Sequence, residues 1–408
     1  MAIEYRELEI RFPNGDFETI TGGNIVAESM VVTKSICDGN LKLGGCIASQ
    51  FELQLIGVNP DKVQGKKIQA VFLEYSDEHF EVLYPHDDLI PSDNLIPDGH
   101  LSYNCTEKII FTGYVDTAKR QKNREIVNII AYDELYIIGN KNVFTWFDQF
   151  ATYSGNAYIM TLVESLFTSQ IGYDENSNPN GMQWVLRWQR SGGNSNYSRP
   201  LSLSQYVAES IYSKGDIIAS DILRSANELM GLFGYMTNDG KYTTLSLIGQ
   251  QEITIDNWIE LDFEEYITEQ IDIVGFTYNN SDKIVFGRDS SMKSTYFSDD
   301  NILTNCSTVH NSVSALINNV TNANNNGGLS SNSYRYRPFK MTTAEDLLPT
   351  QKIGLGSKVH IKTGYNDIKY VDSFIFQEKI KGIQSLMYEF SAEGDRILNG
   401  YDNVTEVI

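Results

Sequence analysis

Apolar and polar positions alternate with a helical period most clearly between residues 221 and 233. The apolar side chains recur at intervals of three or four residues, as on one face of a helix: Ile222, Leu223, Ala226, Leu229, Met230 and Phe233. The polar side chains fall on the opposite face: Arg224, Ser225, Asn227 and Glu228. The pattern predicts that a charge at Leu229 or Met230 prevents folding, whereas truncation of Glu228 to alanine is nearly silent.

The residues around this helix predict where it begins and ends. Ser220 or Asp221 can cap its start, because short polar side chains accept hydrogen bonds from the first free N–H groups. Gly231 and Gly234 interrupt the helical period. An Asn-Asp-Gly sequence at residues 238–240, between two runs with strand alternation, suits a hairpin tip. The pattern therefore predicts a helix that runs directly into a β-hairpin.

The first 140 residues consist almost entirely of short alternating or β-branched runs, separated by Pro, Gly, Asn and Asp. The predicted strands are residues 4–12, 24–33, 48–58, 66–75, 79–83, 108–116 and 125–135. Residues 85–100 contain three prolines and predict a long loop. So many short strands indicate a β-barrel or a β-sandwich, and residues 1–140 are expected to form the first domain.

Residues 141–248 show a different pattern and predict a small α/β module. Helical periodicity occurs at residues 159–167 and 203–211, as well as at 222–233. Between the first two helices, residues 182–190 alternate as on a strand, with Trp184 and Trp188 on one face.

Strand patterns return after residue 249 and define the third predicted domain, residues 249–408. The predicted strands are residues 252–255, 271–279, 283–288, 358–363, 369–378 and 385–393. One helical insertion is predicted at residues 307–322, where Val309, Val313, Leu316, Ile317 and Val320 form an apolar stripe. The fold class is therefore mixed β and α+β.

Composition restricts the possible functions. The chain of 408 residues carries a net charge of −21, which argues against binding to nucleic-acid phosphates. No apolar run is long enough for a membrane segment, so a chain made in the cytoplasm is expected. The four cysteines have no metal-binding spacing and are expected to be buried thiols: Cys37, Cys46, Cys105 and Cys306.

Candidate chemistry is sparse. A cluster of carboxylates could in principle supply an acid and a base for glycoside hydrolysis: Glu260, Asp262, Glu264, Glu265, Glu269 and Asp272. Because apolar residues alternate with them, a strand or short helix with a solvated acidic face explains the cluster better. His79, His86 and His100 match no zinc or calcium pattern, and His310 and His360 lack a nearby ligand set in the sequence. No catalytic, cofactor-binding or metal-binding residue is predicted, and no enzyme activity or cofactor is expected.

The helix followed by NDGKYTTLSL resembles a segment of the baseplate hub and tail-tip proteins of tailed bacteriophages, including those of prophages and phage-tail-like particles. Three further stretches are similar to the same family. They are IIFTGYVDTAKRQKNREIVNIIAYDEL at residues 109–135, YRPF and IGLG at 336–339 and 353–356, and KVHIKTGYNDIKYVDSFIFQEKIKGIQSLMYEFSAEG at 358–394. The resemblance implies two tube-like β-barrel domains, joined by the α/β module, with small helical insertions.

The resemblance also implies a function. A hub subunit closes the distal end of the tail tube in the virion, attaches the spike or tip fibre protein, and lets DNA or the tape-measure protein pass without specific binding. Since two similar barrels in each of three copies match a sixfold tube, a homotrimer is expected. Contractile and flexible tails are both compatible with the sequence. The alternatives are a cell-wall carbohydrate-binding or glycoside-cleaving protein, or a baseplate adaptor subunit other than the hub.

Overall fold

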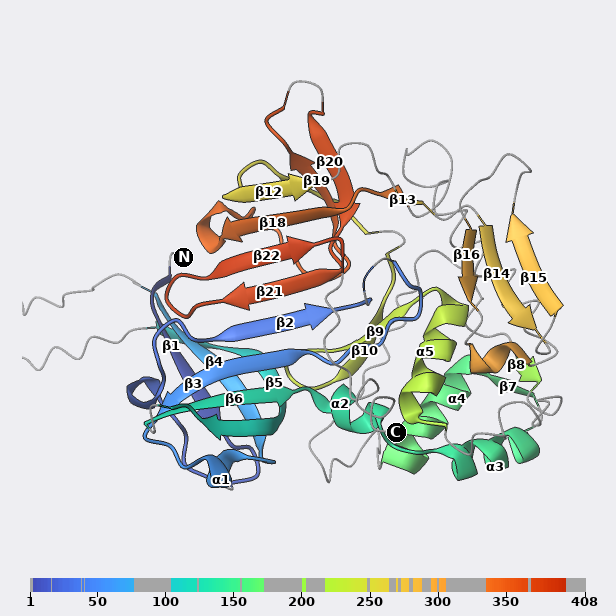
Figure 1. The fold of residues 1–408 in the computed structure, drawn as a ribbon, viewed down its shortest axis with the longest axis horizontal. Coiled ribbons are helices and arrows are strands. Elements are labelled where there is room, and N and C mark those ends of the chain that lie inside the picture. Colours follow the sequence, from blue (N-terminus) through green and yellow to red (C-terminus); the bar gives the residue numbers. More distant parts are fainter. Residues whose placement is uncertain are drawn as a thin grey trace, which may run out of the picture.

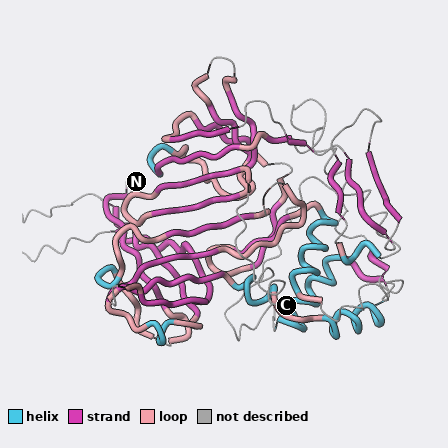
Figure 2. The backbone as a smooth tube through the Cα atoms, viewed as in Figure 1, coloured by secondary structure: helices cyan, strands magenta, loops and turns pink. Residues whose placement is uncertain are grey.

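The fold was described from a computed structural model of the whole chain. It describes residues 3–15, 17–37, 39, 41–76, 104–122, 125–154, 156–171, 200–202, 217–247, 250–263, 269–270, 273–278, 282–287, 295–298, 301–305, 335–365 and 368–393. Within these ranges, strands predominate and the longer helices gather beside one end of the largest sheet (Figure 2). No helix in these ranges has the length and apolar character needed to cross a membrane.

A ten-stranded antiparallel sheet connects the beginning and the end of the chain (Figure 1). In spatial order its strands are β1 (Ile3–Arg11), β4 (Lys67–Ser76), β5 (Asn104–Arg120), β6 (Ile126–Tyr132), β3 (Gln50–Ile56), β2 (Val31–Ser35), β21 (Gln377–Lys381), β22 (Met387–Ser391), β18 (Phe339–Ala344) and β12 (Glu260–Phe263). Strand β2 pairs with β3 on one side and with β21 on the other. We call the part from β1 to β2 the first β region and the part from β21 to β12 the second β region.

The first β region curls strongly. Ile20 pairs with Ile10 of β1, and Ile25 pairs with Leu55 of β3. The segment from Ile20 to Ile25, which contains the helix η1 (Gly22–Asn24), therefore bridges β1 and β3. The helix α1 (Pro60–Val63) follows β3 and packs against β5. These links are isolated pairs, and the described strands form an open, curled sheet rather than a closed barrel. The mixed, mainly β fold is as predicted, but the pairing does not establish two separate barrels.

Smaller elements surround the large sheet. A second sheet contains β11 (Glu252–Ile255), β19 (Lys358–Lys362) and β20 (Tyr370–Phe374), and β11 runs parallel to β19. The helices are α2 (Glu134–Gly139), α3 (Phe144–Ser154), α4 (Ile159–Ser165), which continues as η2 (Leu166–Ile171), and α5 (Ala219–Met230). A hairpin of β9 (Phe233–Met236) and β10 (Tyr242–Leu245) follows α5. Two further short helices are η6 (Ile302–Asn305) and η7 (Glu345–Leu347). A three-stranded sheet contains β15 (Asp282–Gly287), β14 (Ile273–Tyr278) and β16 (Thr295–Ser298). Two strand pairs complete the described elements: β7 (Asn156–Tyr158) with β8 (Pro200–Ser202), and β13 (Glu269–Gln270) with β17 (Arg335–Tyr336).

Two apolar cores hold these layers together. The core of the first β region lies inside the curl, where Phe51 stacks on Phe111 with ring centroids 5.2 Å apart. Ile383 and Leu386, from the turn between β21 and β22, complete this core. The larger core surrounds α5 and extends under the second β region. Both β regions are therefore packed on shared apolar contacts as well as joined by backbone hydrogen bonds.

The predicted helix and hairpin are present, with shifted ends. The helix begins at Ala219, so Asp221 does not cap it; its carboxylate instead accepts a hydrogen bond from the N–H of Ile218 at 3.3 Å. It ends at Gly231, whose φ of 67° is left-handed, and Phe233 belongs to β9. Gly240 at the hairpin tip has a φ of 80°, as the Asn-Asp-Gly sequence predicts.

Most predicted strands are confirmed and a few are shorter. Of the strand predicted at residues 24–33, only β2 forms, and the strand predicted at 369–378 is divided between β20 and the start of β21. The end of the strand predicted at 125–135 is the start of α2, because Asp133 caps that helix by accepting the N–H of Leu135. The predictions for residues 79–83, 85–100, 182–190, 203–211 and 307–322 lie outside the described residues.

Candidate functional site

One face of the large sheet is polar across both β regions. Directly opposed residues in antiparallel strands place their side chains on the same face, so register identifies the members of a face. One row of such partners crosses six strands: Gln50, Thr33, Lys379, Glu389, Thr342 and Glu260. We call the surface formed by this row and its neighbours the polar face. The opposite side of the same strands carries the buried apolar residues Phe51, Met341 and Phe390.

Charges of both signs alternate on the polar face. The side chain of Lys381 forms an ion pair with Glu389 on the neighbouring strand. The amide of Gln50 donates to the carboxylate of Glu52 at 2.8 Å. Asp262 lies opposite Lys340 in the register of β12 and β18, and both are exposed. This arrangement hydrates the surface while leaving little net charge along it, and it provides no acid and base pair in an enclosed site.

A buried arginine joins the two β regions at one end of this sheet. The Arg6 side chain is only 2% exposed. Its guanidinium contacts Glu74 of β4 at 3.1 Å and both carboxylate oxygens of Glu345 at 3.0 and 2.9 Å. It also donates to the backbone carbonyl of Ile383 at 3.3 Å and lies 5.1 Å from the ring centroid of Phe72. Two carboxylates, a carbonyl and an aromatic face compensate for the desolvation of this charge.

The turn between β21 and β22 is held against β1 by further specific contacts. The N–H of Arg6 donates to the side-chain oxygen of Gln384 at 3.1 Å, and the amide of Gln384 donates back to the carbonyl of Arg6. Glu28, which has a positive φ of 58°, accepts the N–H groups of Ile383 and Gln384 at 2.9 and 3.2 Å. Gly382 is required here, because its φ of 87° is left-handed and a Cβ at this position would lie 2.5 Å from the backbone carbonyl of Ser385 and 2.5 Å from the Glu28 carboxylate. We call these contacts and those of Arg6 the arginine clamp.

The second junction is built on α5, and its polar side is buried rather than exposed. Glu228, predicted to lie on a solvated face, is 2% exposed. Its carboxylate accepts a hydrogen bond from Asn301 at 2.7 Å, and Asn301 also donates to the carbonyl of Ser225 at 3.0 Å. Because η6 and the residue before it cover this side of the helix, the structure removes the basis for expecting Glu228→Ala to be nearly silent, and a loss of stability is now expected.

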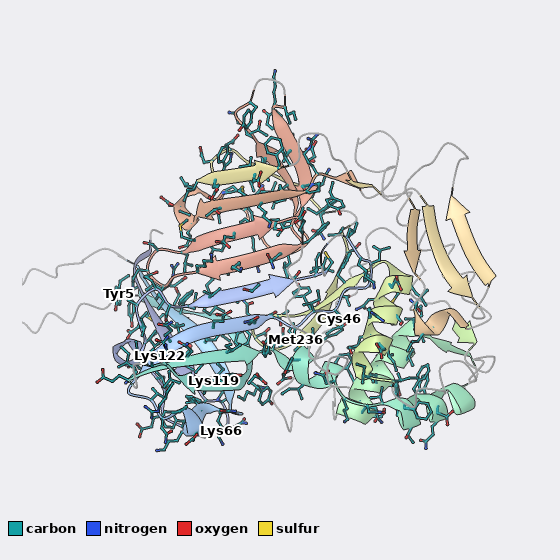
Figure 3. The ribbon with its side chains drawn as sticks, in the orientation of Figure 1. Tyr5, Cys46, Lys66, Lys119, Lys122 and Met236 are labelled. Carbon is teal, nitrogen blue, oxygen red and sulfur yellow. The ribbon has the colours of Figure 1, made fainter. Side chains whose placement is uncertain are left out.

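Gly44 and Gly234, on elements that contact α5, leave no room for a side chain. A Cβ at Gly44 would lie 2.5 Å from the carbonyl of Arg224, and one at Gly234 would lie 2.4 Å from the Tyr242 hydroxyl. That hydroxyl accepts a hydrogen bond from the Asn227 amide at 2.9 Å. Cys46 pairs with Gly234 in a parallel bridge, and Figure 3 places Cys46 beside Met236, between the large sheet and α5. Burial raises the pKa of the Cys46 thiol to about 12, so this thiol is protonated at neutral pH.

A third buried polar group connects the first β region to α2. The Lys67 ammonium contacts the Glu134 carboxylate at 2.6 Å, and both side chains are buried. Asp133 beside it accepts the N–H of Ser49 at 2.7 Å. Burial raises the pKa of Asp133 to about 7 despite the opposing effect of these hydrogen bonds. These groups attach the helix to the sheet.

The candidate catalytic and ligand residues are only partly described. Glu260 and Asp262 are exposed on β12, where Leu261 and Phe263 alternate with them, as expected for a strand with an acidic face. Glu269 belongs to β13. Glu264, Glu265, Asp272, His79, His86, His100, His310, Trp184 and Trp188 lie outside the described residues. The described part of the chain contains no group of three His, Cys, Asp or Glu side chains able to hold a metal ion.

Two expectations about single residues need correction. His360 does have a carboxylate partner: its Nδ1 lies 2.5 Å from Asp372 on the neighbouring strand. Cys37 is buried, as expected, but Cys46 is partly buried and Cys105 is exposed. Cys306 lies outside the described residues.

Comparison with known proteins gives structural relatives only. No protein-family model and no curated protein matches the chain. Among solved structures, the chain is similar to the 43 kDa tail protein of prophage MuSo2 from Shewanella oneidensis, with 9% identity, a TM-score of 0.50, and coverage of 96% of this chain and 98% of that chain. The tail protein from Neisseria meningitidis MC58 aligns with 12% identity, a TM-score of 0.48, and coverage of 97% and 98%. A chain of the Francisella PdpA-VgrG complex aligns with 12% identity and a TM-score of 0.39, over 95% of this chain and 58% of that chain.

The similarity to the MuSo2 protein extends over nearly the whole chain. The chain therefore has the fold of a phage tail protein. At this level of identity the likeness concerns the fold alone.

Proposed function

We propose that this protein is a structural subunit of a phage-type tail, at the baseplate hub or tail tip, and that it has no enzymatic activity. The observation that carries the proposal is the polar face, whose row of paired polar residues crosses from the first β region into the second through the pairing of β2 with β21, with Thr33 buried at the junction. The fold shared with a prophage tail protein supports the same role.

The polar face is suited to line the bore of a ring. In this proposal, copies of the chain turn the face inward, and each copy contributes its two β regions as two similar modules. Lysines on the face lie opposite or beside carboxylates, as Lys381 does with Glu389, so the surface neither holds phosphates tightly nor repels them strongly. DNA or a tape-measure protein could then slide through a hydrated channel.

The proposal includes three copies in the ring, a tail tube protein above it and a spike or tip fibre protein below it. It retains the division of each chain into a first barrel-like domain at residues 1–140, an α/β module at 141–248 and a second barrel-like domain at 249–408. The arginine clamp supports the role of a rigid ring subunit, because it fixes the angle between the two β regions with buried, directional contacts.

Electron cryomicroscopy of the purified chain, across a range of protein and salt concentrations, tests this proposal. The expected particle is a closed ring of three copies with the polar face on the inner surface. Higher salt should favour assembly, since a net charge of −21 on each copy opposes association at low salt. A dimer, an open filament, or a ring with the polar face directed outward would contradict the hub assignment.

A further inference from the structure

The hairpin of β19 and β20 presents aromatic side chains that are exposed but held in place. Tyr365 and Tyr370 are 59% and 43% exposed. The N–H of Tyr365 donates to the Thr363 hydroxyl at 3.1 Å, and its ring meets the edge of Phe263 at 5.9 Å between centroids. Tyr370 stacks on His360, with centroids 4.0 Å apart. Tyrosines fixed in this way lose little conformational entropy when a partner covers them.

This hairpin also carries lysines beside the tyrosines, together with Asp372, whose carboxylate contacts Nδ1 of His360. Lys362 and Lys369 lie beside the tyrosines and are exposed. Among the described residues, neither ammonium group has a carboxylate within ion-pair distance. The hairpin projects away from the large sheet next to its edge strand β12 (Figure 1). We call Tyr365, Tyr370, Lys362 and Lys369 the hairpin patch.

The opposite edge of the sheet carries a complementary surface. Tyr5 of β1 is 53% exposed, its ring lies 5.7 Å from that of Tyr75, and Tyr75 is opposite Cys105 in register. Figure 3 places Tyr5 at the edge of the first β region, far from the hairpin of β19 and β20. The next row on the same face consists of Glu7, Leu73 and Glu107. We call these two rows the β1 patch; it combines aromatic rings with carboxylates.

Six large apolar or aromatic side chains are exposed in the described part of the chain, and three of them, Tyr5, Tyr365 and Tyr370, belong to these two patches. A fourth, Ile259, adjoins the hairpin, since the indole N–H of neighbouring Trp258 donates to the carbonyl of Lys362 at 2.7 Å. Exposed aromatic residues surrounded by charges are typical of protein interfaces. One patch adds Lys362 and Lys369 and the other adds the Glu7 carboxylate, so the two patches carry opposite charges.

We propose that the hairpin patch of one copy docks on the β1 patch of the next copy. The inference rests on the proposed ring, and it identifies the surfaces that close it. A contact between two different patches of the same chain is heterologous, and repetition of such a contact gives a ring when its rotation closes. Tyrosine packing provides the apolar contact, and Lys362 and Lys369 meet the carboxylate of Glu7, which favours the correct neighbour over other orientations. Glu107 does not take part in this pairing, because both of its carboxylate oxygens bind Arg11 of the same chain.

Covalent trapping of neighbouring copies tests the contact. The variant Tyr365→Cys, treated with a short bis-maleimide under assembling conditions, is expected to link to the native Cys105 of the adjacent copy and give covalent dimers and larger species. The same treatment of Tyr365→Cys combined with Cys105→Ser is expected to give none of these species. Asp61→Cys, on the exposed end of α1, is the matched control and is expected to remain unlinked to Cys105. Persistent cross-links after Cys105→Ser would overturn the proposal.

Charge reversal supplies the second measurement. Lys362→Glu with Lys369→Glu is expected to weaken assembly at least roughly tenfold, as measured by mass photometry, and addition of Glu7→Lys is expected to restore part of the loss. A ring that assembles normally in these variants, without the Cys105 cross-link, would overturn this contact and leave the hub assignment intact. A filament with the cross-link would support the contact and contradict the closed ring. A chain that stays monomeric under every condition would overturn both.

Discussion

The arginine clamp and the α5 junction attach the two β regions to the rest of the molecule in different ways. At the clamp, one buried cation from β1 is shared by carboxylates and a carbonyl that come from distant parts of the chain. At α5, a continuous apolar stripe is packed into the larger core, and the polar side of the same helix is covered by η6. The clamp thus depends on a few charge-assisted hydrogen bonds, whereas the α5 junction depends mainly on buried apolar area.

This difference predicts how each junction fails. A substitution in the apolar stripe of α5 affects the larger of the two cores, which also packs under the second β region, so folding itself should be lost. A substitution in the clamp leaves the cores intact but strands buried charges, so the chain should fold with reduced stability and a loosened connection between the β regions.

The largest effect is expected for Leu229→Asp. Leu229 is 2% exposed in the larger core, and an unpaired carboxylate there costs about 5 kcal/mol or more, which is comparable to the whole stability of many domains. We expect no soluble folded protein, measured as recovery after expression and by circular dichroism. Leu229→Met is the matched control and should fold, since it keeps the volume and the apolar character. A folded Leu229→Asp protein with the melting temperature of the parent would contradict the assignment of this face to the core.

Removal of the buried charge in Arg6→Gln should have the next largest effect. The substitution removes the buried cation that Glu74 and Glu345 share. Glu74 then keeps its ion pair with Lys108, at 3.6 Å, and Glu345 is 37% exposed, so the cost is expected at the lower end for a broken buried pair, about 3 kcal/mol. Urea unfolding should show a lower midpoint, and hydrogen exchange should increase in the turn at residues 382–385. Arg6→Lys should retain part of the stability, because it keeps the charge but loses the forked contact with Glu345. Unchanged exchange in that turn would show that the clamp does not hold it.

Glu228→Ala measures how much the buried polar side of α5 contributes to the α5 junction, for comparison with the arginine clamp. The substitution leaves the amide of Asn301 without its side-chain acceptor in a buried site and should cost about 2 kcal/mol. Urea unfolding of Glu228→Ala and Glu228→Gln, measured together, separates charge from hydrogen bonding, since glutamine retains an acceptor oxygen. A nearly silent Glu228→Ala would show that the cover provided by η6 contributes little.

The sequence predicts local elements well, because the signals for them are local. The periodicity of α5, the Asn-Asp-Gly tip and the alternation of β1 each depend on residues within one or two turns or along one strand. For the acidic residues at 260–263, alternation with Leu261 and Phe263 leaves a strand and a short helix open, and the structure shows a strand paired with β18. The exposed acidic side, though not the strand itself, is therefore readable from the sequence.

Contacts between polar residues that are far apart in the sequence could not be predicted, because no local pattern signals them. Glu228 has the position of a solvated residue on its helix, and only the fold brings Asn301 to it. Arg6 is one of several charged residues in an alternating strand, and its contacts with Glu345 and Ile383 come from residues more than three hundred positions away. His360 meets Asp372 only because β19 and β20 pair in this register. The glycine at position 382 is the one local sign of the clamp. The sequence cannot indicate that Glu28 fills the space where a Cβ of residue 382 would be.

Arg11 provides the smallest expected effect and isolates burial as the cause of the difference. It lies on β1, five residues after Arg6, and forms comparable contacts, with Glu107 at 2.8 Å and Glu9 at 2.8 Å. The guanidinium hydrogen bond from Arg11 lowers the pKa of the Glu107 carboxyl, so any contribution of this pair is present at neutral pH and is lost as the pH falls through the lowered pKa. Because Glu107 is exposed, water and salt screen the pair, and Arg11→Gln should unfold at nearly the same urea concentration as the parent. The comparison is to be made at neutral and acidic pH, and at low and high salt, with Arg6→Gln alongside. A loss for Arg11→Gln as large as that for Arg6→Gln would mean that the number of ion contacts, rather than their burial, determines the strength of the junction.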